Sequence, residues 1–398
     1  MNELVAILLP RDDILTSAIE SIWETGDAFC VIDTRLPKSQ TQTLLNSLAP
    51  TMLIEDASLS RHRVRGGQKV EEGDAYVVAT SGTTGMPKGV IHTWGSLEAS
   101  SSATTARMGI DPSADGWICA LPPSHVGGLS IITRSLLSGT KVWVIDGFDK
   151  QEIKTRQKLG ANLISVVTSA VHMIDPNSFK VVLLGAQAPP KELPENFLVT
   201  YGMTETGSGV VYNNYPIASV KVACSPTNEV LIDAPMLARG YRDGNPIKSN
   251  DGFYRTGDLG EITADGRVTI YGRASEMINS GGEKLFPSPI EDSIRRHPSV
   301  KEVAVFGQPD ARWGEVVVAA LVVKDNAPEP SKDELRELVT SEVAPWAYPK
   351  EIYIVDEIPR TSLGKVQRSL LRQRLLASKY SVQSKMVASP ATNTIDLD

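Results

Sequence analysis

The sequence predicts an α/β protein. A large N-terminal domain consists of parallel-sheet α/β subdomains with a small β-barrel, and a small α+β domain follows it. Helix-like and strand-like stretches alternate up to about Glu229, which is typical of α/β architecture. The apolar stretches have the length of strands and do not alternate cleanly with polar residues, as in parallel sheets covered on both faces. Beyond that point, short alternating strands with Asp-Gly turns predict an antiparallel barrel or meander.

The first 72 residues already show this alternation. LTSAIESIWETG (15–26) and TQTLLNSL (41–48) are helix-like, and AFCVIDTR (28–35) and TMLIED (51–56) are strand-like. The pattern continues from Asp74. Strands are predicted at AYVVAT, GWICALP, KVWVID, NLISVVTS and FKVVLLG, and helices at SLEASSSATTARMG, at GLSIITRSLLSG and before NLISVVTS.

A third region begins near Glu276 and predicts a small α+β unit. Its expected helices cover residues 288–297, 331–343 and 366–376, and its expected strands are KEVAVFG and EVVVAALVVK. The last residues, 381–398, are polar and aperiodic, and we expect a disordered tail there.

Composition excludes several classes of function. The 398 residues are 41% hydrophobic and carry a net charge of -7, whereas a general nucleic-acid binder needs clustered Lys and Arg. No apolar stretch approaches the length of a membrane span, and the N-terminus lacks a basic region and a cleavage site, so we expect a cytoplasmic protein without membrane insertion. Cys30, Cys119 and Cys224 form no metal or disulfide pattern and are expected to be buried small apolar residues.

The stretch VVATSGTTGMPKGVIHTW (77–94) is rich in Gly, Ser and Thr around one lysine, Lys88. Glycines let backbone N–H groups turn inward, hydroxyls add donors and the lysine adds a charge, so the loop is suited to surround an anion. It is not a Walker P-loop, because Pro87 precedes the lysine and Gly89 follows it. Taken alone, it could equally be a mobile surface turn.

Seven motifs occur in a fixed order, and together they resemble the acyl-adenylate-forming (AMP-binding) superfamily of acyl-CoA ligases, peptide-synthetase adenylation domains and luciferases. The motifs are TSGTTGMPKG, LPPSHVGGL, LLGAQAP, YGMTETG, YRTGDLG, YGRASEMINSGGEKLFPSPIE and PRTSLGKVQR. The resemblance extends from about Asp74 to Arg374. It implies an N-terminal AMP-binding domain at 1–273, a mobile C-terminal AMP-binding domain at 274–380 on a hinge, and the tail at 381–398.

The family chemistry implied here is the ligation of a carboxylic acid to a thiol, with ATP, Mg²⁺ and coenzyme A. The acid attacks the α-phosphate of ATP, and the thiol then displaces AMP. The chain departs from the family in its short N-terminal segment of 73 residues before Asp74, in Ser275 at the hinge and in Thr168 where relatives often have Pro. The change at Ser275 leaves the ease of domain rotation open.

The resemblance assigns catalytic roles to five residues. Lys88 would hold the β- and γ-phosphates, and Lys365 would bridge the carboxylate and the α-phosphate. Thr204 would donate to the α-phosphate, and Glu205 would be the Mg²⁺ ligand. His125 would be a gate beside the acyl pocket. Outside the motifs, Lys365 and Glu205 would be read as solvated surface residues.

Other positions are expected to bind the nucleotide or the thiol. Tyr201 offers a flat face to adenine, Asp258 would accept both ribose hydroxyls, and Gly281 and Gly282 would face the pantetheine tunnel. The remaining expected nucleotide contacts are Thr80, Ser81, Gly82, Thr83, Thr84, Gly85, Gly185, Ala186, Gln187, Gly202, Met203 and Arg273.

Four residues are expected to contact the acid: His125, Arg134, Gly185 and Gly207. Arg134 lies in the apolar helix LSIITRSLL, where an unpaired guanidinium is costly, so it either extends to solvent or meets an anion. A second substrate carboxylate would be such an anion. The segment HVGGLSIITRSLLSG and the short N-terminus are similar to the o-succinylbenzoate–CoA ligases of menaquinone biosynthesis, which implies that diacid as the substrate.

Other readings stay open. The chain could be an aryl- or medium-chain acyl-CoA ligase, an adenylating enzyme that loads a carrier protein, or a non-catalytic nucleotide-binding paralogue. The expected partners are ATP, CoA and a small carboxylic acid, without nucleic acid. A homodimer is also expected as a possibility, since family members often form dimers.

Overall fold

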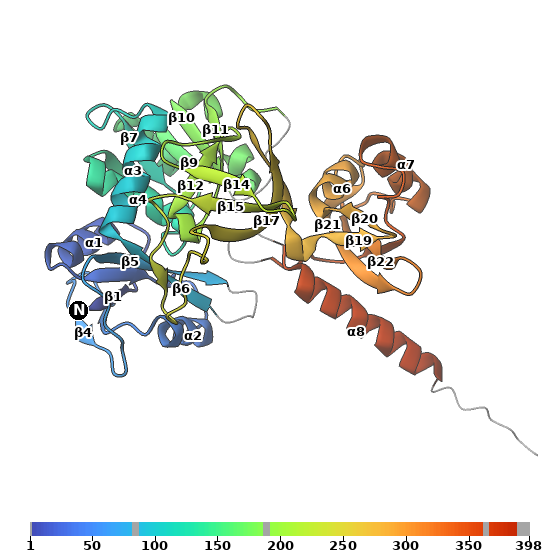
Figure 1. The fold of residues 1–398 in the computed structure, drawn as a ribbon, viewed down its shortest axis with the longest axis horizontal. Coiled ribbons are helices and arrows are strands. Elements are labelled where there is room, and N and C mark those ends of the chain that lie inside the picture. The colour runs from blue at the N-terminus through green and yellow to red at the C-terminus, as the bar shows by residue number, and fades with distance from the viewer. Residues whose placement is uncertain (1, 82–86, 186–191, 361–365, 388–398) are drawn as a thin grey trace, which may run out of the picture. The chain divides into compact units, whose positions relative to one another are not determined.

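The computed structural model describes residues 2–81, 87–185, 192–360 and 366–387, and the chain divides into two compact units (Figure 1). The large unit contains residues 1–256 and 260–270, and the small unit contains residues 257–259 and 271–398. The units therefore change after Ile270, whereas the sequence places the boundary after residue 273.

The first sheet of the large unit has seven strands in the order β16-β6-β5-β2-β1-β3-β4. Its centre is parallel, because β1 pairs in parallel with β2 and β3, and β2 with β5. The outer strands β6, β16 and β4 are antiparallel to their neighbours. The bounds are β1 Leu4–Ile7, β2 Ala28–Val31, β3 Met52–Ile54, β4 His62–Arg63, β5 Asp74–Ser81, β6 Pro87–Thr93 and β16 Gly240–Tyr241.

The second sheet also has seven strands, in the order β13-β12-β11-β10-β9-β7-β8. Strands β8, β7, β9, β10 and β11 are parallel, and β12 and β13 are antiparallel additions. The bounds are β7 Gly116–Cys119, β8 Lys141–Val144, β9 Leu163–Val167, β10 Val181–Gly185, β11 Phe197–Met203, β12 Ser208–Tyr212 and β13 Tyr215–Pro216.

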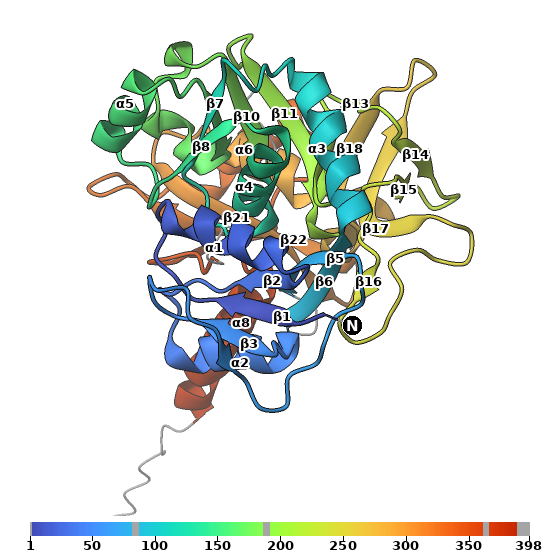
Figure 2. The same ribbon diagram turned by 90° about the vertical axis from the view of Figure 1, so that its left-hand side faces the viewer.

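Five helices cover these sheets: α1 Ile14–Glu24, α2 Lys38–Leu48, α3 Trp94–Met108, α4 Val126–Ser138 and α5 Lys150–Lys158. Helices α1 and α2 lie on opposite faces of the first sheet (Figures 1 and 2). Helix α3 begins at a capping box in which Thr93 and Ser96 exchange side-chain and backbone hydrogen bonds. It packs on β5 and β6, and α4 packs on β7, β8 and β9, while α3 and α4 also contact each other.

Successive residues of the central strands enter different hydrophobic cores. On β1, Val5 and Ile7 belong to the core that holds α1 and α4, whereas Leu4 and Ala6 belong to the core beneath α2. On β7, Trp117 and Ile118 are divided in the same way between two cores. This confirms the predicted α/β class with parallel strands covered on both faces.

The region predicted as a barrel or meander forms a four-stranded sheet in the order β14-β15-β17-β18, with consecutive strands side by side except for β16, which joins the first sheet. The bounds are β14 Lys221–Cys224, β15 Glu229–Asp233, β17 Tyr254–Ile262 and β18 Val268–Arg273. The unit boundary passes through β17 and β18.

In its described residues, the small unit has a five-stranded sheet and three α-helices, which agrees with the predicted α+β class. Its strands are β19 Ile278–Ser280, β20 Glu283–Leu285, β21 Val300–Asp310, β22 Gly314–Val323 and β23 Glu351–Ile354, and its helices are α6 Pro287–Ile294, α7 Lys332–Glu342 and α8 Arg368–Val387. Helix α8 extends well past the predicted end at residue 376, because neither Pro nor Gly interrupts it before Val387.

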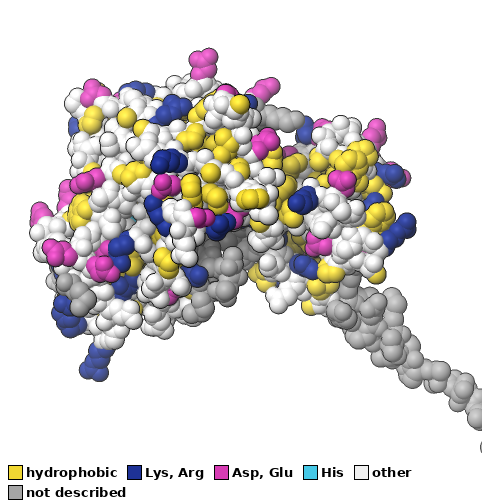
Figure 3. All heavy atoms as spheres, in the orientation of Figure 1, with side chains coloured by type: hydrophobic (Ala, Val, Ile, Leu, Met, Phe, Trp, Pro, Cys, Tyr) yellow, Lys and Arg dark blue, Asp and Glu magenta, His cyan; other side chains and the backbone are white. Residues whose placement is uncertain are grey.

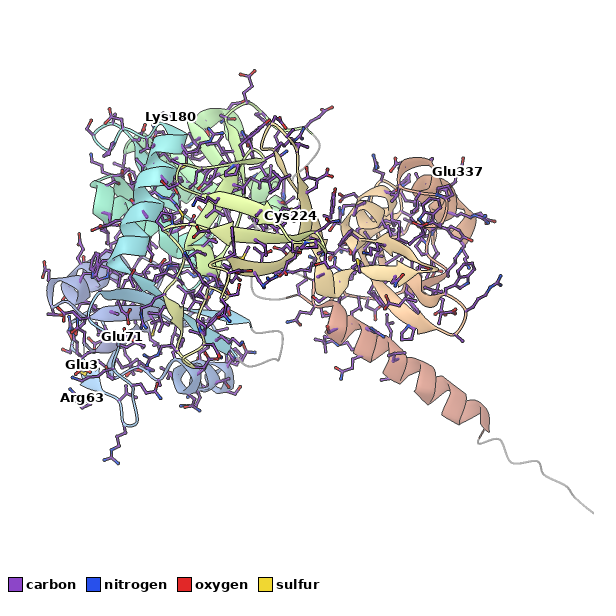
Figure 4. The ribbon with its side chains drawn as sticks, in the orientation of Figure 1. Glu3, Arg63, Glu71, Lys180, Cys224 and Glu337 are labelled. Carbon is purple, nitrogen blue, oxygen red and sulfur yellow. The ribbon has the colours of Figure 1, made fainter. Side chains whose placement is uncertain are left out.

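The cysteines and the surface charges show no unusual grouping among the described residues. Cys30 and Cys119 are buried, and burial raises the pKa of each thiol to about 12, so both behave as small apolar residues. Cys224, labelled on β14 in Figure 4, is only partly buried. Basic and acidic side chains are interspersed on the face in Figure 3. In the described part of the chain, every helix is too short or too polar to span a membrane.

Candidate active site

The strands on either side of the predicted phosphate loop form an antiparallel pair. Thr80 of β5 lies opposite Lys88 of β6, and Ser81 lies opposite Pro87, so the loop connects the two ends of a hairpin. Lys88 lies on a strand and not at the start of a helix, which confirms that the loop is not of the Walker type. The other predicted loop residues, Gly82, Thr83, Thr84 and Gly85, are outside the described residues.

The turn after β11 carries the predicted Thr204 and Glu205. A single 3-10 turn, Thr204–Thr206, follows the strand directly and ends at Gly207, whose φ of +68° favours glycine. At Gly202, a Cβ would lie 2.2 Å from the Ser208 carbonyl oxygen, so only glycine fits where β11 and β12 pair. The Thr206 hydroxyl donates to the Ser208 carbonyl at 2.7 Å. The turn is therefore tightly held by its own residues.

Tyr241 connects the Glu205 carboxylate with Lys88. Strand β16 places Tyr241 opposite Val90 of β6, and the Tyr241 hydroxyl donates to Glu205 Oε1 at 3.0 Å. Lys88 Nζ lies 5.4 Å from the centroid of the same ring, within cation–π range. Burial and the Glu205 carboxylate raise the pKa of Tyr241, so the hydroxyl stays protonated and remains a donor. One ring thus contacts a cation and a carboxylate that lie far apart in the sequence.

His92 forms a hydrogen bond with the backbone of the same turn. It lies on β6 and is 1% exposed, and its Nε2 is 2.7 Å from the Thr204 carbonyl oxygen. Its ring stacks on Tyr76 with centroids 4.8 Å apart. Burial lowers the pKa of His92 to about 4, partly opposed by the hydrogen bond to Thr204, so the ring is neutral near pH 7.

The predicted adenine site lies where β10 and β11 end side by side. β10 ends at Gly185, where an added Cβ would lie 3.1 Å from the Thr200 hydroxyl of β11. Tyr201 follows on β11 and is half-buried, and Met203 is the last residue of that strand. The predicted Ala186 and Gln187 are outside the described residues. The two strands therefore bring Gly185 and Tyr201 to the same edge of the sheet.

Helix α4 positions the two residues expected to contact the acid. His125 is its N-cap residue, with an extended backbone. At Gly128, a Cβ would lie 2.5 Å from the carbonyl oxygens of Leu121 and Pro122, so the first turn is held against that segment. Arg134 lies further along the same helix.

Arg134 does not extend to solvent, because it is only 2% exposed. Its Nη2 donates to the Ser208 hydroxyl at 3.3 Å, and its guanidinium carbon lies 5.7 Å from the centroid of the Trp117 ring. No described residue accepts a hydrogen bond from Arg134 Nε or Nη1. Burial lowers the pKa of Arg134, while the nearby Tyr212 and Tyr76 hydroxyls oppose the change. Nearby, Tyr212 Oη and Trp117 Nε1 also lack a hydrogen-bond partner among the described residues.

Two predicted nucleotide contacts form an ion pair. Arg273 Nε lies 2.9 Å from Asp258 Oδ1, and the Asp258 side chain is buried. Gly257, with a φ of +70°, allows the approach, since an added Cβ would lie 3.4 Å from Arg273 Nη1. The two residues predicted to contact the nucleotide therefore lie side by side on β17 and β18.

The predicted thiol-side glycines form the turn between β19 and β20. Gly281 and Gly282 have φ values of +63° and +90°, and at Gly281 a Cβ would lie 2.7 Å from the Trp313 ring. Lys365 is outside the described residues. Three residues later, Arg368 donates to Glu291 at 2.7 Å and to Glu276 at 3.1 Å, in the turn Ala274–Glu276 where the hinge is predicted.

The structure thus brings together Lys88, Glu205 and Thr204 in the large unit, and Asp258 and Arg273 on β17 and β18. Tyr241 and His92, which contact this turn, are not among the residues predicted from the sequence. Both contacts are long-range, since His92 and Thr204 are 112 residues apart, and neither residue stands in a pattern that would have indicated a partner.

The acidic residues present fit a magnesium ion bound mainly through phosphate. Among the described residues, no group of three or more His, Cys, Asp or Glu side chains could hold a metal ion. Glu205 provides a single carboxylate beside the strand that carries Lys88. Mg²⁺ commonly takes one or two carboxylates and completes its shell with waters and substrate phosphates.

Comparisons with known proteins point to one family. The family model of AMP-binding enzymes matches residues 66–235, and that of the AMP-binding enzyme C-terminal domain matches residues 289–365. A "Probable 2-succinylbenzoate–CoA ligase" of Mycobacterium tuberculosis is 35% identical over 338 residues, covering 78% of this chain and 87% of that protein.

Solved structures of a Bacillus subtilis o-succinylbenzoate CoA synthetase are also similar. The complex with its acyl-adenylate intermediate superposes with a TM-score of 0.81 at 26% identity, covering 93% of this chain and 88% of that one. The complex with ATP and magnesium gives a TM-score of 0.81 at 26% identity, covering 93% and 89%.

Proposed function

Because the chain belongs to the AMP-binding enzyme family, we propose that it is an ATP-dependent ligase that joins o-succinylbenzoate to coenzyme A in menaquinone biosynthesis. A carboxylate oxygen of the acid bonds to the α-phosphorus of ATP, and pyrophosphate leaves. The CoA sulfur then bonds to the acyl carbon, its proton passes to solvent, and AMP leaves. The products are the CoA thioester, AMP and pyrophosphate.

The first step brings two anions together, so the protein must neutralise charge and fix positions. Lys88 contributes a cation at the start of β6. Glu205 would hold Mg²⁺, which when bound supplies further positive charge to the phosphates. Tyr241 fixes the Glu205 carboxylate, and the Thr204–Thr206 turn presents Thr204 beside it. Lys365 would supply the cation at the reacting carboxylate and the α-phosphate.

Arg134 is the observation that favours a diacid. A buried guanidinium with two nitrogens that lack a described acceptor lowers the stability of the folded protein. A second substrate carboxylate would accept a charge-assisted hydrogen bond from one of these nitrogens and neutralise the buried guanidinium. Of the two carboxylates of o-succinylbenzoate, one would react and the other would pair with Arg134. Gly207 and His125 would line the space around the acyl chain.

Carboxylate-dependent release of AMP tests this proposal. We would compare o-succinylbenzoate, benzoate, octanoate and acetate as acids with Mg·ATP and CoA. We expect strong selectivity for o-succinylbenzoate, and a loss of about 30-fold or more in kcat/KM in Arg134→Met, since about 2 kcal/mol corresponds to that factor. Arg134→Lys is the matched variant, which keeps the charge but loses the planar fork. Equal activity on monocarboxylates, unaffected by Arg134→Met, would contradict the diacid substrate.

The proposal also covers the partners and the location. The partners are the small molecules ATP, CoA and the acid. We place the enzyme in the cytoplasm, because ATP and CoA are supplied there, and cell fractionation tests this. We expect a homodimer, as in many family members, and light scattering in solution measures it.

A further inference from the structure

His92 is a buried titratable residue to which the proposed chemistry gives no role. It lies on the strand that leaves the phosphate loop, four residues after Lys88. Its ring nitrogen Nε2 is 2.7 Å from the carbonyl oxygen of Thr204. The residue therefore joins the strand of Lys88 to the turn that presents Thr204 and Glu205.

The protonation of the ring follows from its partner. A carbonyl oxygen can only accept a hydrogen bond, so Nε2 must carry the proton and donate. The other ring nitrogen, Nδ1, lies 3.3 Å from the Ser96 hydroxyl, at the capping box of α3. A neutral ring with the proton on Nε2 fits this arrangement, and the ring stacks on Tyr76.

The turn that His92 supports is short. It comprises Thr204–Thr206, and its outward connections include Ala238 N, which donates to the Glu205 carbonyl at 2.8 Å. Gly207 rests on the His92 ring, since an added Cβ there would lie 3.2 Å from Cε1. The Tyr241 hydroxyl, which donates to the Glu205 side chain, also holds the turn. The Thr204 carbonyl oxygen accepts from Gly207 N at 3.0 Å within the turn, and from His92 Nε2, which belongs to strand β6 outside the turn.

We propose that His92 is a positioning residue of the adenylation step: its Nε2–H donor holds the Thr204 carbonyl and so fixes Thr204 and Glu205 relative to the strand of Lys88. This inference rests on the proposed function, because it concerns the same Mg·ATP site. Residues behind metal ligands and reacting groups typically change affinity or activity by 10–100-fold when they are removed. A purely structural core histidine would instead affect stability and both half-reactions equally.

Two substitutions separate the donor from the bulk of the side chain. His92→Leu removes the donor, whereas His92→Gln can place an amide N–H near the position of Nε2. His297→Leu is the matched control, because it removes a histidine of the small unit whose Nδ1 accepts from Ser299 N at 3.2 Å. Each protein is first checked for folding by its thermal transition.

The readouts are pyrophosphate exchange, thioester formation from supplied acyl-adenylate, and ATP binding with and without Mg²⁺. We expect His92→Leu to slow pyrophosphate exchange and to weaken Mg·ATP binding by about 10–100-fold. Thioester formation should fall much less than pyrophosphate exchange, since the acyl-adenylate keeps the α-phosphate that Thr204 would contact but has no β- and γ-phosphates. His92→Gln should recover most of the exchange rate, and His297→Leu should match the wild type.

The outcomes distinguish the inference from the proposed function. If folded His92→Leu binds Mg·ATP and exchanges pyrophosphate like the wild type, the inference is wrong. It is also wrong if both half-reactions fall equally, or if folded His92→Gln is as impaired as His92→Leu. If the wild type shows no exchange with any acid, the proposed function fails, and the Mg²⁺-dependent loss of ATP affinity in His92→Leu still decides the positioning role.

Discussion

Replacing Arg134 with methionine separates a ligand-binding arginine from a structural one. Methionine fills a similar volume without a charge or a hydrogen-bond donor. In a satisfied buried ion pair, removal of one partner costs about 3–5 kcal/mol. Arg134 has no described carboxylate partner, and two of its nitrogens lack an acceptor among the described residues.

The expected change in stability follows from these contacts. Each unsatisfied buried donor costs about 1–3 kcal/mol, so removing the two nitrogens recovers about 4 kcal/mol. Against this, the substitution loses one hydrogen bond of a charged group to Ser208, worth about 2 kcal/mol, and the contact with the Trp117 ring, worth about 1 kcal/mol. The free energy of unfolding should therefore change by no more than about 1–2 kcal/mol.

Chemical denaturation with and without o-succinylbenzoate measures both parts of the prediction. At 100 times the dissociation constant, the acid should stabilise the wild type by about 2.7 kcal/mol and Arg134→Met by much less. The reasoning would be refuted if Arg134→Met lost 3 kcal/mol or more without the acid and the wild type gained nothing from it. Arg134 would then be a structural residue.

Three further predictions concern other residues. Tyr241→Phe removes the hydroxyl that donates to Glu205 but keeps the ring beside Lys88. The Mg²⁺ concentration for half-maximal pyrophosphate exchange should therefore rise about tenfold. The control Tyr215→Phe loses a hydroxyl contact to Asp265 and should leave this concentration unchanged. Lys365→Ala should abolish adenylation but leave thioester formation from supplied acyl-adenylate largely intact, and equal loss in both assays would disprove the assigned role. The pKa of His92 falls from 6.5 to about 4 on folding. Between these two pH values, the unfolded state binds a proton that the folded state does not bind. Acidification from pH 7 to 4 should therefore lower the free energy of unfolding by about 3 kcal/mol. Denaturant titrations against pH should show this component in the wild type and not in His92→Gln, whereas identical slopes would contradict it.

Local sequence patterns were enough to predict the fold class, the buried parallel strands and the absence of a helix at Lys88. Strand-length apolar stretches such as GWIC gave buried parallel strands, because alternate side chains enter two cores. The Pro-Lys-Gly spacing around Lys88 correctly excluded a helix at the lysine, since proline and glycine both oppose one. The position of Arg134 in an apolar helix indicated that its side chain either extends to solvent or meets an anion. Its burial excludes the first possibility.

Contacts between distant segments could not be predicted in this way. Tyr241 reaches Glu205 only because β16 leaves the four-stranded sheet and pairs with β6, and nothing in its two-residue strand indicates that pairing. His92 looks like an ordinary polar residue in a half-apolar stretch, and its partner Thr204 is set by the meeting of two sheets. Side-chain positioning of this kind depends on tertiary packing, which local periodicity does not encode.

The central claim is that this chain forms a CoA thioester of o-succinylbenzoate through an adenylate. The most direct measurement is mass spectrometry of the products after incubation of the wild type with ATP, Mg²⁺, CoA and o-succinylbenzoate. The account predicts o-succinylbenzoyl-CoA and AMP in equal amounts, and an acyl-adenylate when CoA is omitted. Formation of ADP, or AMP release without any acyl-adenylate or thioester, would contradict it.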